Sequence, residues 1–208
     1  MSFMRIAICT LAYLGISLAL AAQERMPPIP ADQLTDAQKK AVADLVEGPR
    51  KSVPAPFWPL VRSPEALSRL QQLGLVLRTS DKLGQKLTEL VILITTRQMN
   101  QQYIYLEHSR LAQKAGLRSD IMAAVGEGRR PAGMDADEEV VYDFCAELLA
   151  NKSVSDATYA RAVAKFSDKG VIDIVTLSGY YTMVSLVANV DRVPLRKGDA
   201  PPLASFPN

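Results

Sequence analysis

The sequence predicts an all-α fold in a single domain. Three observations predict it. No stretch shows the alternating apolar and polar residues of a β-strand, apolar residues recur at helical spacing, and helix-capping residues and glycine stops recur along the chain. The spacing of these signals indicates short antiparallel helices that are joined by short loops.

Residues 1–22 have the pattern of a secretory signal peptide. Arg5 precedes an apolar run from Ile6 to Ala22, and the small-residue pattern Ala19-Leu20-Ala21 precedes a polar, proline-rich stretch. Cleavage after Ala21 leaves 208 − 21 = 187 residues, which suits one domain. We therefore expect a secreted or periplasmic protein with no stable membrane insertion after cleavage. Retention of the run as an N-terminal anchor is the alternative.

Residues 23–49 form an N-terminal segment with one predicted helix. Thr35 and Gln38 make a capping-box pattern that opens a helix to about Glu47, where Gly48 ends it. The main helical domain is expected over residues 50–193. It begins irregularly, because three prolines surround Phe57 and Trp58.

Two helices should follow. Ser63-Pro64-Glu65 is a strong start signal for a helix that runs to about Arg78, and Ser80-Asp81 should begin the next, over Lys82–Met99. From Leu90 onward this second helix is apolar nearly all round, so it must be enclosed by other helices, and Glu89 lies on its second apolar side.

The next predicted helix, Gln101–Ala115, carries the only histidine of the chain. His108 lies in the middle of a stripe that includes Ile104, Leu111 and Ala112, so we expect it to face inward.

The rest of the chain is predicted as a short helix from Ser119 and three longer ones. These cover about Ala136–Leu149, Ser155–Phe166 and Val171–Val190. The last is apolar enough for a central or subunit-interface helix. Residues 194–208 form a Pro-rich tail that we expect to be extended and partly disordered.

The charge balance argues against nucleic-acid binding, and the cysteine content argues against a fold or a chemistry that uses an intramolecular disulfide. With 24 basic and 22 acidic residues the net charge is +2, which gives no nucleic-acid footprint, and Arg50-Lys51 is interpreted as a solvated loop. Cys9 lies in the signal, so the mature chain keeps only Cys145 and has no intramolecular disulfide. Cys145 lies in an apolar helix and is expected to be an inert core residue.

His108 is the main candidate for chemistry, because an imidazole beside a carboxylate can move protons near neutral pH. Glu89, from the preceding antiparallel helix, is the preferred partner. Glu107 is a further candidate, although it points about 100° away on the helix of His108. The alternative is that His108 is a hydrogen-bonded core residue. The scattered acids give no metal-ligand spacing, and no cofactor or metal is predicted.

Substrate binding is assigned to side chains that helical spacing and chemistry place near His108. Arg97 is expected to hold an anionic group, and aromatic and apolar side chains are expected to line a pocket for a small molecule. This group comprises Arg97, Tyr105, Trp58 and Ile104.

Two stretches together resemble a known family. Leu87-Thr88-Glu89-Leu90-Val91-Ile92-Leu93 and the run from Gln102 to Leu117 are similar to the carboxymuconolactone decarboxylase and AhpD-like family, and so is Phe57-Trp58-Pro59-Leu60-Val61-Arg62-Ser63-Pro64. The resemblance spans about residues 50–190. It implies an AhpD-like helical bundle that assembles into a homo-oligomer, a trimer or hexamer, with a pocket near the histidine-bearing helix.

The resemblance also separates two kinds of chemistry. In the redox branch a Cys-x-x-Cys pair precedes the histidine, and a glutamate completes a proton relay. Glu89 and His108 match that glutamate and histidine, but Gln101 and Ile104 stand at the cysteine positions, so thiol peroxidase chemistry is argued against even where the family label of peroxiredoxin activity applies. In the decarboxylase branch a histidine pair is common, and Glu107 stands at the place of its first member.

The sequence therefore favours a cofactor-free lyase or isomerase that acts on a small carboxylated or lactone-type molecule, with His108 and Glu89 as the proton-transfer pair. Two alternatives stay open. One is a non-catalytic small-molecule-binding protein of the same fold, and the other is a thiol peroxidase that would need Cys145 to react with peroxide.

Overall fold

The computed structural model describes residues 23–204, and the predicted signal peptide lies outside these residues. The described part is all-helical and without strands. The α-helices are α1 (Asp36–Glu47), α2 (Pro64–Leu77), α3 (Gly84–Gln98), α4 (Gln102–Lys114), α5 (Ser119–Gly126), α6 (Ala136–Asn151) and α7 (Asp156–Asp191). The 3-10 turns are η1 (Ala31–Gln33), η2 (Ala55–Phe57) and η3 (Pro59–Arg62).

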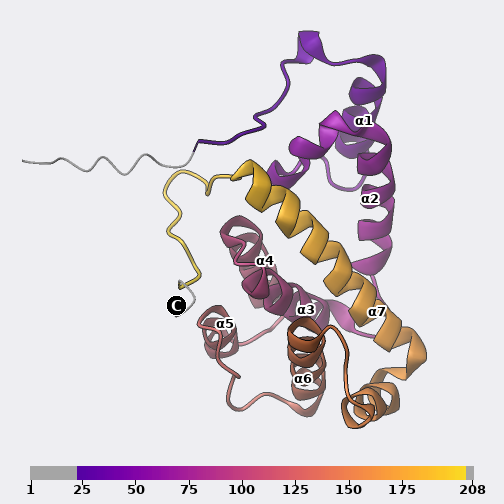
Figure 1. Cartoon of the computed structure of the whole chain (residues 1–208), viewed down its shortest axis with the longest axis vertical. Coiled ribbons are helices and arrows are strands. Elements are labelled where there is room, and N and C mark those ends of the chain that lie inside the picture. The colour runs from indigo at the N-terminus through magenta and orange to yellow at the C-terminus, as the bar shows by residue number, and fades with distance from the viewer. Residues whose placement is uncertain (1–22, 205–208) are drawn as a thin grey trace, which may run out of the picture.

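Helix α3 is the centre of the fold. Every residue from Leu87 to Arg97 is buried, because α4, α5, α6 and α7 all pack against this helix (Figure 1). This enclosure explains why the sequence is apolar on both sides of α3, and it confirms that expectation.

A second group of helices lies at the other end of the molecule. Helix α1 packs on α2, and α2 packs on α7, which runs diagonally across the view in Figure 1. Thr35 accepts a hydrogen bond from the Gln38 backbone at 3.3 Å, and the Gln38 side chain accepts one from Thr35 at 2.9 Å, which confirms the predicted capping box. Helix α2 begins at Pro64 as predicted, although the Ser63 side chain makes no capping bond.

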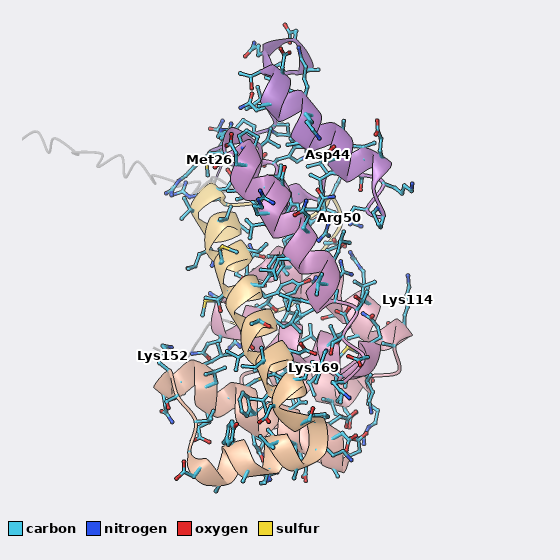
Figure 2. The ribbon with its side chains drawn as sticks, turned by 90° about the vertical axis from the view of Figure 1, so that its right-hand side faces the viewer. Met26, Asp44, Arg50, Lys114, Lys152 and Lys169 are labelled. Carbon is cyan, nitrogen blue, oxygen red and sulfur yellow. The ribbon has the colours of Figure 1, made fainter. Side chains whose placement is uncertain are left out.

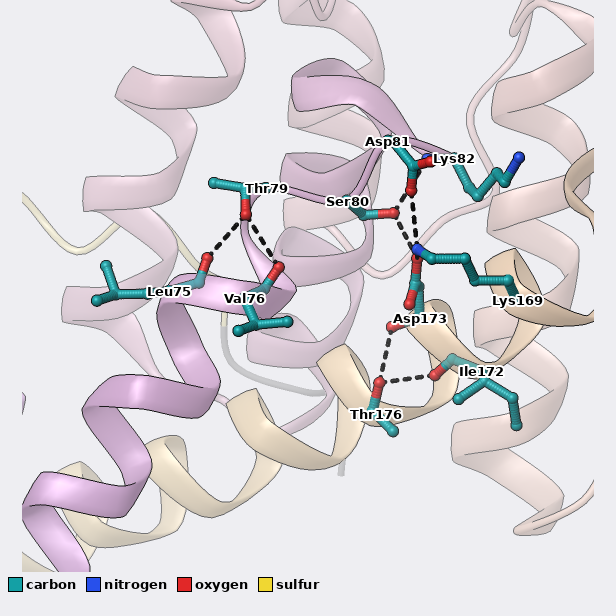
Figure 3. Close-up of polar contacts among 10 residues, drawn as sticks. All are labelled: Leu75, Val76, Thr79, Ser80, Asp81, Lys82, Lys169, Ile172, Asp173 and Thr176. Carbon is teal, nitrogen blue, oxygen red and sulfur yellow. Dashed lines mark hydrogen bonds and ion pairs between the residues drawn. The ribbon is translucent and has the colours of Figure 1, made fainter.

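The turn between α2 and α3 is fastened to α7 (Figure 3). The Ser80 hydroxyl donates to Asp173 at 2.5 Å, and Lys169 contacts both Asp81 at 2.8 Å and Asp173 at 2.9 Å. Ser80 therefore bonds to α7, and α3 starts at Gly84, two residues later than the sequence predicts. These contacts fix the backbone that follows Arg78.

Helix α7 is interrupted at Ser167, whose φ of 63° and ψ of 173° are not helical. The break separates a short segment that ends at Phe166 from a long one that begins at Asp168, which agrees with the two helices predicted there. The long segment passes between α2 and α3 and brings Tyr180 and Tyr181 into the core.

The C-terminal segment, residues 194–204, is extended, as predicted, but it is also packed. It returns along α4 (Figure 1), where the Gln102 side chain accepts from Leu203 N at 3.0 Å and donates to Leu203 O at 3.3 Å. Leu203 is buried. The buried Leu203 side chain and its two hydrogen bonds with the Gln102 side chain thus hold this part of the segment, while residues 205–208 of the predicted tail lie outside the described residues.

Within the described residues, α7 is the one helix that is long and apolar enough to cross a membrane. Half of its most apolar window is buried inside the protein, as in the core helix of a folded domain. Length and composition alone are therefore weak evidence for a membrane span.

Candidate active site

Glu89 and His108 are in direct contact. Glu89 lies on α3 with no solvent exposure, and its Oε2 is 2.6 Å from His108 Nδ1 on α4. The other carboxylate oxygen accepts a hydrogen bond from Gln85 Nε2 at 2.5 Å. A carboxylate only accepts, so Nδ1 of the imidazole carries the proton of this contact, and Nε2 is left for another partner. The predicted meeting of these two side chains is present.

Tyr181 holds the other side of the imidazole. Its ring meets the His108 ring edge-on, with centroids 4.9 Å apart and an interplanar angle of 82°. Tyr180 packs edge-on against Tyr181 at 5.2 Å. Because Glu89 and Tyr181 are both buried, the imidazole is held in one orientation.

His108 opens on a cavity of about 260 Å³. Ile104, Glu107 and Leu111 line it from α4, and Tyr180, Tyr181 and Val184 line it from α7. Residues that precede α2 close the far side, and they include Phe57. The wall combines arginine and tyrosine side chains with apolar ones, which suits a small organic molecule with a charged group.

Two arginines in this wall were not predicted from the sequence. Arg50 follows the end of α1, where Figure 2 shows it beside α2, and Arg78 caps the C-terminus of α2. Arg50 is half-buried, and its guanidinium carbon lies 4.8 Å from the centre of the Phe57 ring. Burial lowers the pKa of Arg50, against the opposing effect of Tyr180, and the positive charge of Arg78 lowers it further. The interpretation of Arg50 as part of a solvated loop is therefore corrected.

Glu107 lies in the wall of the cavity, where two arginines pair with its carboxylate. It forms ion pairs with Arg110, one turn later on α4, and with Arg196 from the C-terminal segment. Arg110 also binds Asp199 at 2.6 Å, so the same network ties the C-terminal segment to α4. Arg196 lines the cavity.

The residues predicted to bind substrate are only partly brought together. Ile104 lines the cavity, but the structure places Arg97, Tyr105 and Trp58 outside it. Arg97 donates to Ala204 O at 2.7 Å and borders a different hollow, near Tyr142. Arg97 lies eight residues after Glu89, which is about 12 Å along a helix, and that distance removes it from His108.

Tyr105 and Trp58 have structural surroundings of their own. The Tyr105 hydroxyl donates to Met122 O at 2.6 Å, which joins α4 to α5. Trp58 is partly buried against the core, next to Phe57. The expectation that these three side chains contact substrate is corrected, because each is engaged elsewhere.

The positions that would carry thiols in the redox branch are occupied by structural side chains. Gln101 caps α4, where its Oε1 accepts from Ile104 N at 2.8 Å. Cys145 is fully buried in α6 and does not line the cavity. Burial raises the pKa of its thiol to about 12, although a hydrogen bond with Ser178 opposes the shift. The prediction of an inert core cysteine agrees with this burial.

Metal-binding clusters are absent from residues 23–204, where no three His, Cys, Asp or Glu side chains come together.

The comparisons with known proteins rest on structure alone, since no family model and no curated protein matches the sequence. A solved structure from Ralstonia eutropha JMP134 is described as the alkylhydroperoxidase AhpD core of an uncharacterized peroxidase-related protein. It matches with a TM-score of 0.68 at 16% identity, over 84% of this chain and 93% of that chain. The fold is AhpD-like.

A second solved structure supports the same assignment. An uncharacterized peroxidase-related protein from Silicibacter sp. TM1040 matches with a TM-score of 0.70 at 18% identity, over 86% of this chain and 96% of that chain. At such identities the likeness establishes the AhpD-like fold and leaves the chemistry to the residues of the site.

Proposed function

We propose that this AhpD-like protein is a proton-transfer enzyme, a cofactor-free lyase or isomerase that acts on a small carboxylated or lactone-type molecule. The observation that carries the proposal is the 2.6 Å contact between Glu89 and His108 at the wall of a cavity. Glu89 is a positioning residue, because it holds Nδ1 and thereby directs Nε2 of His108 towards a bound molecule.

In a decarboxylation this arrangement would act after carbon–carbon cleavage. The bond between the substrate carbon and its carboxylate breaks, carbon dioxide leaves, and the electron pair stays on carbon as an enolate. Nε2–H of His108 then gives its proton to that carbon, and water returns a proton to the imidazole. In an isomerisation the same nitrogen first removes a proton from carbon and then returns it to another position.

The proposal is tested by carbon-bound hydrogen exchange. Small 3-oxo acids and unsaturated lactone carboxylates are incubated with the protein in deuterated water, and deuterium incorporation and carbon dioxide release are followed by NMR. The wild-type protein should accelerate one of these processes. His108→Gln should lower the rate by about a hundred- to ten-thousandfold, the usual range for general acid–base help.

Circular dichroism and size-exclusion chromatography should show that His108→Gln keeps the fold and assembly. Lys114→Gln provides a matched control, because Lys114 is exposed at the end of the same helix and outside the cavity. Full activity in His108→Gln, or no accelerated exchange in the wild-type protein across the panel, would contradict the proposal.

A non-catalytic binding protein is the second candidate, and the presence of a cavity lined by His108 and arginines favours it. It predicts that a compound retained during native purification is returned unchanged after long incubation, which native mass spectrometry can detect. Conversion of that compound would favour the enzyme.

The two structural neighbours are described as peroxidase-related, but this chain has no suitable nucleophile for thiol peroxidase activity among the described residues. Cys9 and Cys145 are the only cysteines of the chain, and Cys145 is buried away from His108 in α6. A peroxidase of the AhpD type needs an accessible thiolate.

Export and homo-oligomer formation complete the proposal. Residues 1–22 support export by their composition, and fractionation of expressing cells, with N-terminal sequencing of the product, tests for cleavage after Ala21. A trimer or hexamer is proposed from the resemblance and from the apolar exposed side of α7.

A further inference from the structure

Arg50 and Arg78 are two cations that face the cavity without an anion. Among residues 23–204 neither guanidinium has an ion pair or a hydrogen bond, and the Nε atom of each is fully buried without a partner. Glu107 is the acid in the described cavity wall, and it binds Arg110 and Arg196, while Glu89 lies behind the wall and binds His108. The two arginines therefore leave a local excess of positive charge in the cavity wall.

This excess of positive charge in a partly buried wall is unfavourable. Burial and the charge of Arg78 both lower the pKa of Arg50, which shows that its charged form is disfavoured where it stands. A buried donor without a hydrogen-bond partner also costs free energy. An anion between the two guanidinium groups would relieve both effects.

Tyr180 supplies a third donor at the same place. Its hydroxyl is buried without a hydrogen-bond partner, and Arg50 and Arg78 both act on its ionisation. A Cβ on Gly74 would stand 2.4 Å from the Tyr180 hydroxyl and 3.2 Å from Arg50 Nη2. The absence of a side chain at Gly74 thus lets the hydroxyl and the guanidinium approach α2 together.

We propose that Arg50, Arg78 and Tyr180 form a carboxylate-binding subsite of this cavity. A guanidinium presents two parallel N–H donors that match the two oxygens of a carboxylate, and a neutral tyrosine hydroxyl adds a further donor. Phe57, which stacks on Arg50, provides an apolar wall for the body of the ligand. The ligand class is a small monocarboxylate or dicarboxylate with an apolar, preferably planar, frame.

The subsite also assigns a role to the carboxylate that it holds. Tyr181 links the subsite to His108, since its ring contacts both the Tyr180 ring and the His108 ring. A cation stabilises a carboxylate more than it stabilises neutral carbon dioxide, so paired arginines would oppose the loss of the group that they hold. The carboxylate bound by Arg50 and Arg78 is therefore one that the product keeps, while the reacting carbon lies at His108. This last assignment rests on the proposed function, whereas anion binding does not.

Binding of simple carboxylates tests the subsite without any turnover. Isothermal titration calorimetry is performed with benzoate and hexanoate, each compared with its neutral amide, and with inorganic phosphate. We expect at least one carboxylate to bind tenfold or more tightly than its amide and than phosphate. Arg50→Gln and Arg78→Gln should each weaken that binding by about tenfold or more.

Two controls separate the possible failures. Arg69→Gln removes the same charge from an exposed position of α2 outside this cavity and should leave carboxylate binding unchanged. His108→Gln should keep carboxylate binding even though it abolishes proton transfer. Thermal unfolding checks each fold, and Arg78→Lys, which keeps the charge but loses the planar fork, should bind with intermediate affinity.

The proposal is overturned if neither carboxylate binds better than its amide, if phosphate binds best, or if Arg78→Gln binds carboxylates as the wild-type protein does. If the arginine variants lose carboxylate binding while His108→Gln keeps full turnover, the subsite stands and the proton-transfer function fails.

Discussion

Glu89 and His108 lie 19 residues apart in the chain, and Glu89 Oε2 is 2.6 Å from His108 Nδ1. Because Nδ1 is engaged in this contact, Nε2 is the nitrogen that remains for a molecule in the cavity that His108 lines. The contact depends on the antiparallel packing of α3 and α4 and on the full burial of Glu89. It turns a lone histidine into an oriented group, since the buried carboxylate selects which nitrogen carries the fixed proton.

The first prediction concerns that proton. His108 is the only histidine, so protein labelled with 15N-histidine gives a single imidazole in the NMR spectrum. We expect the neutral imidazole to carry its proton on Nδ1, which faces Glu89, with Nε2 as the bare nitrogen. Glu89→Ala should restore exchange between the two neutral tautomers, whereas Glu107→Ala should not. Equal spectra for these variants would show that Glu89 does not orient the ring.

The second prediction concerns turnover when the charge of Glu89 is removed. Glu89→Gln keeps the volume and an acceptor for Nδ1 but lacks the carboxylate that stabilises a charged imidazole, so kcat should fall by about tenfold or more with little change in KM. Steady-state kinetics with the substrate found in the exchange experiment give both constants. A change confined to KM would instead indicate a role in binding.

The third prediction concerns the close approach of α2 and α7 at Gly74. Gly74→Ala places a Cβ 2.4 Å from the Tyr180 hydroxyl, so Tyr180 must move, and we expect a loss of about 1–3 kcal/mol in unfolding free energy. Gly179→Ala is the matched control, because no atom lies within 4 Å of its Cβ position on α7. Alanine favours a helix by up to about 1 kcal/mol over glycine, so this control should be stabilised. Urea unfolding measures both, and equal losses in the two variants would argue against crowding at Gly74.

The sequence predicted Glu89 as the preferred partner of His108, and their contact itself comes from the structure. Helical spacing put His108 on an inward stripe, and the apolar surroundings of Glu89 required that α3 be enclosed. Ile104 followed from the same reasoning, since it lies one turn before His108 and shares its face. Patterns within a helix therefore carried this part of the site.

Arg50 and Arg78 could not be found in this way. Each stands just beyond the end of a helix, where no periodicity indicates which way a side chain points. Their meeting depends on how α1, α2 and α7 pack, and a single arginine beside a lysine in a loop usually faces water. Phe57 and Gly74 contact this pair of arginines or lie beside it, but neither residue predicts the subsite until the packing of the helices is known. The prediction that Arg97 lies near His108 differs from the structure for another reason. Arg97 lies inside helix α3, but about two turns after Glu89, which places it away from His108.

The fourth prediction concerns the reactivity of Cys145. In a Cys9→Ser variant Cys145 is the only thiol, and with a pKa near 12 about one in ten thousand of these thiols is ionised at pH 8. Ellman's reagent should therefore leave the folded protein almost unmodified and label one thiol per chain in guanidinium chloride. Hydrogen peroxide should be consumed no faster by this variant than by one that also carries Cys145→Ser. Rapid labelling of the folded protein, or peroxide consumption that depends on Cys145, would reopen the thiol peroxidase alternative.

The fifth prediction concerns the C-terminal segment, which closes one side of the cavity through Arg196. Leu203 anchors this segment, and burial of a leucine side chain is worth about 1.5–3 kcal/mol. Leu203→Asp should release the segment and increase the rate of tryptic cleavage after Arg196 or Lys197 by about tenfold or more. Ala200→Asp adds the same charge at an exposed position of the segment and should have little effect. Cleavage is followed by mass spectrometry, and equal rates for the two variants would show that Leu203 does not hold the segment. Release should also remove the positive charge of Arg196 from the cavity wall and leave Glu107 with Arg110 as its remaining partner, so carboxylate binding at Arg50 and Arg78 should weaken in Leu203→Asp.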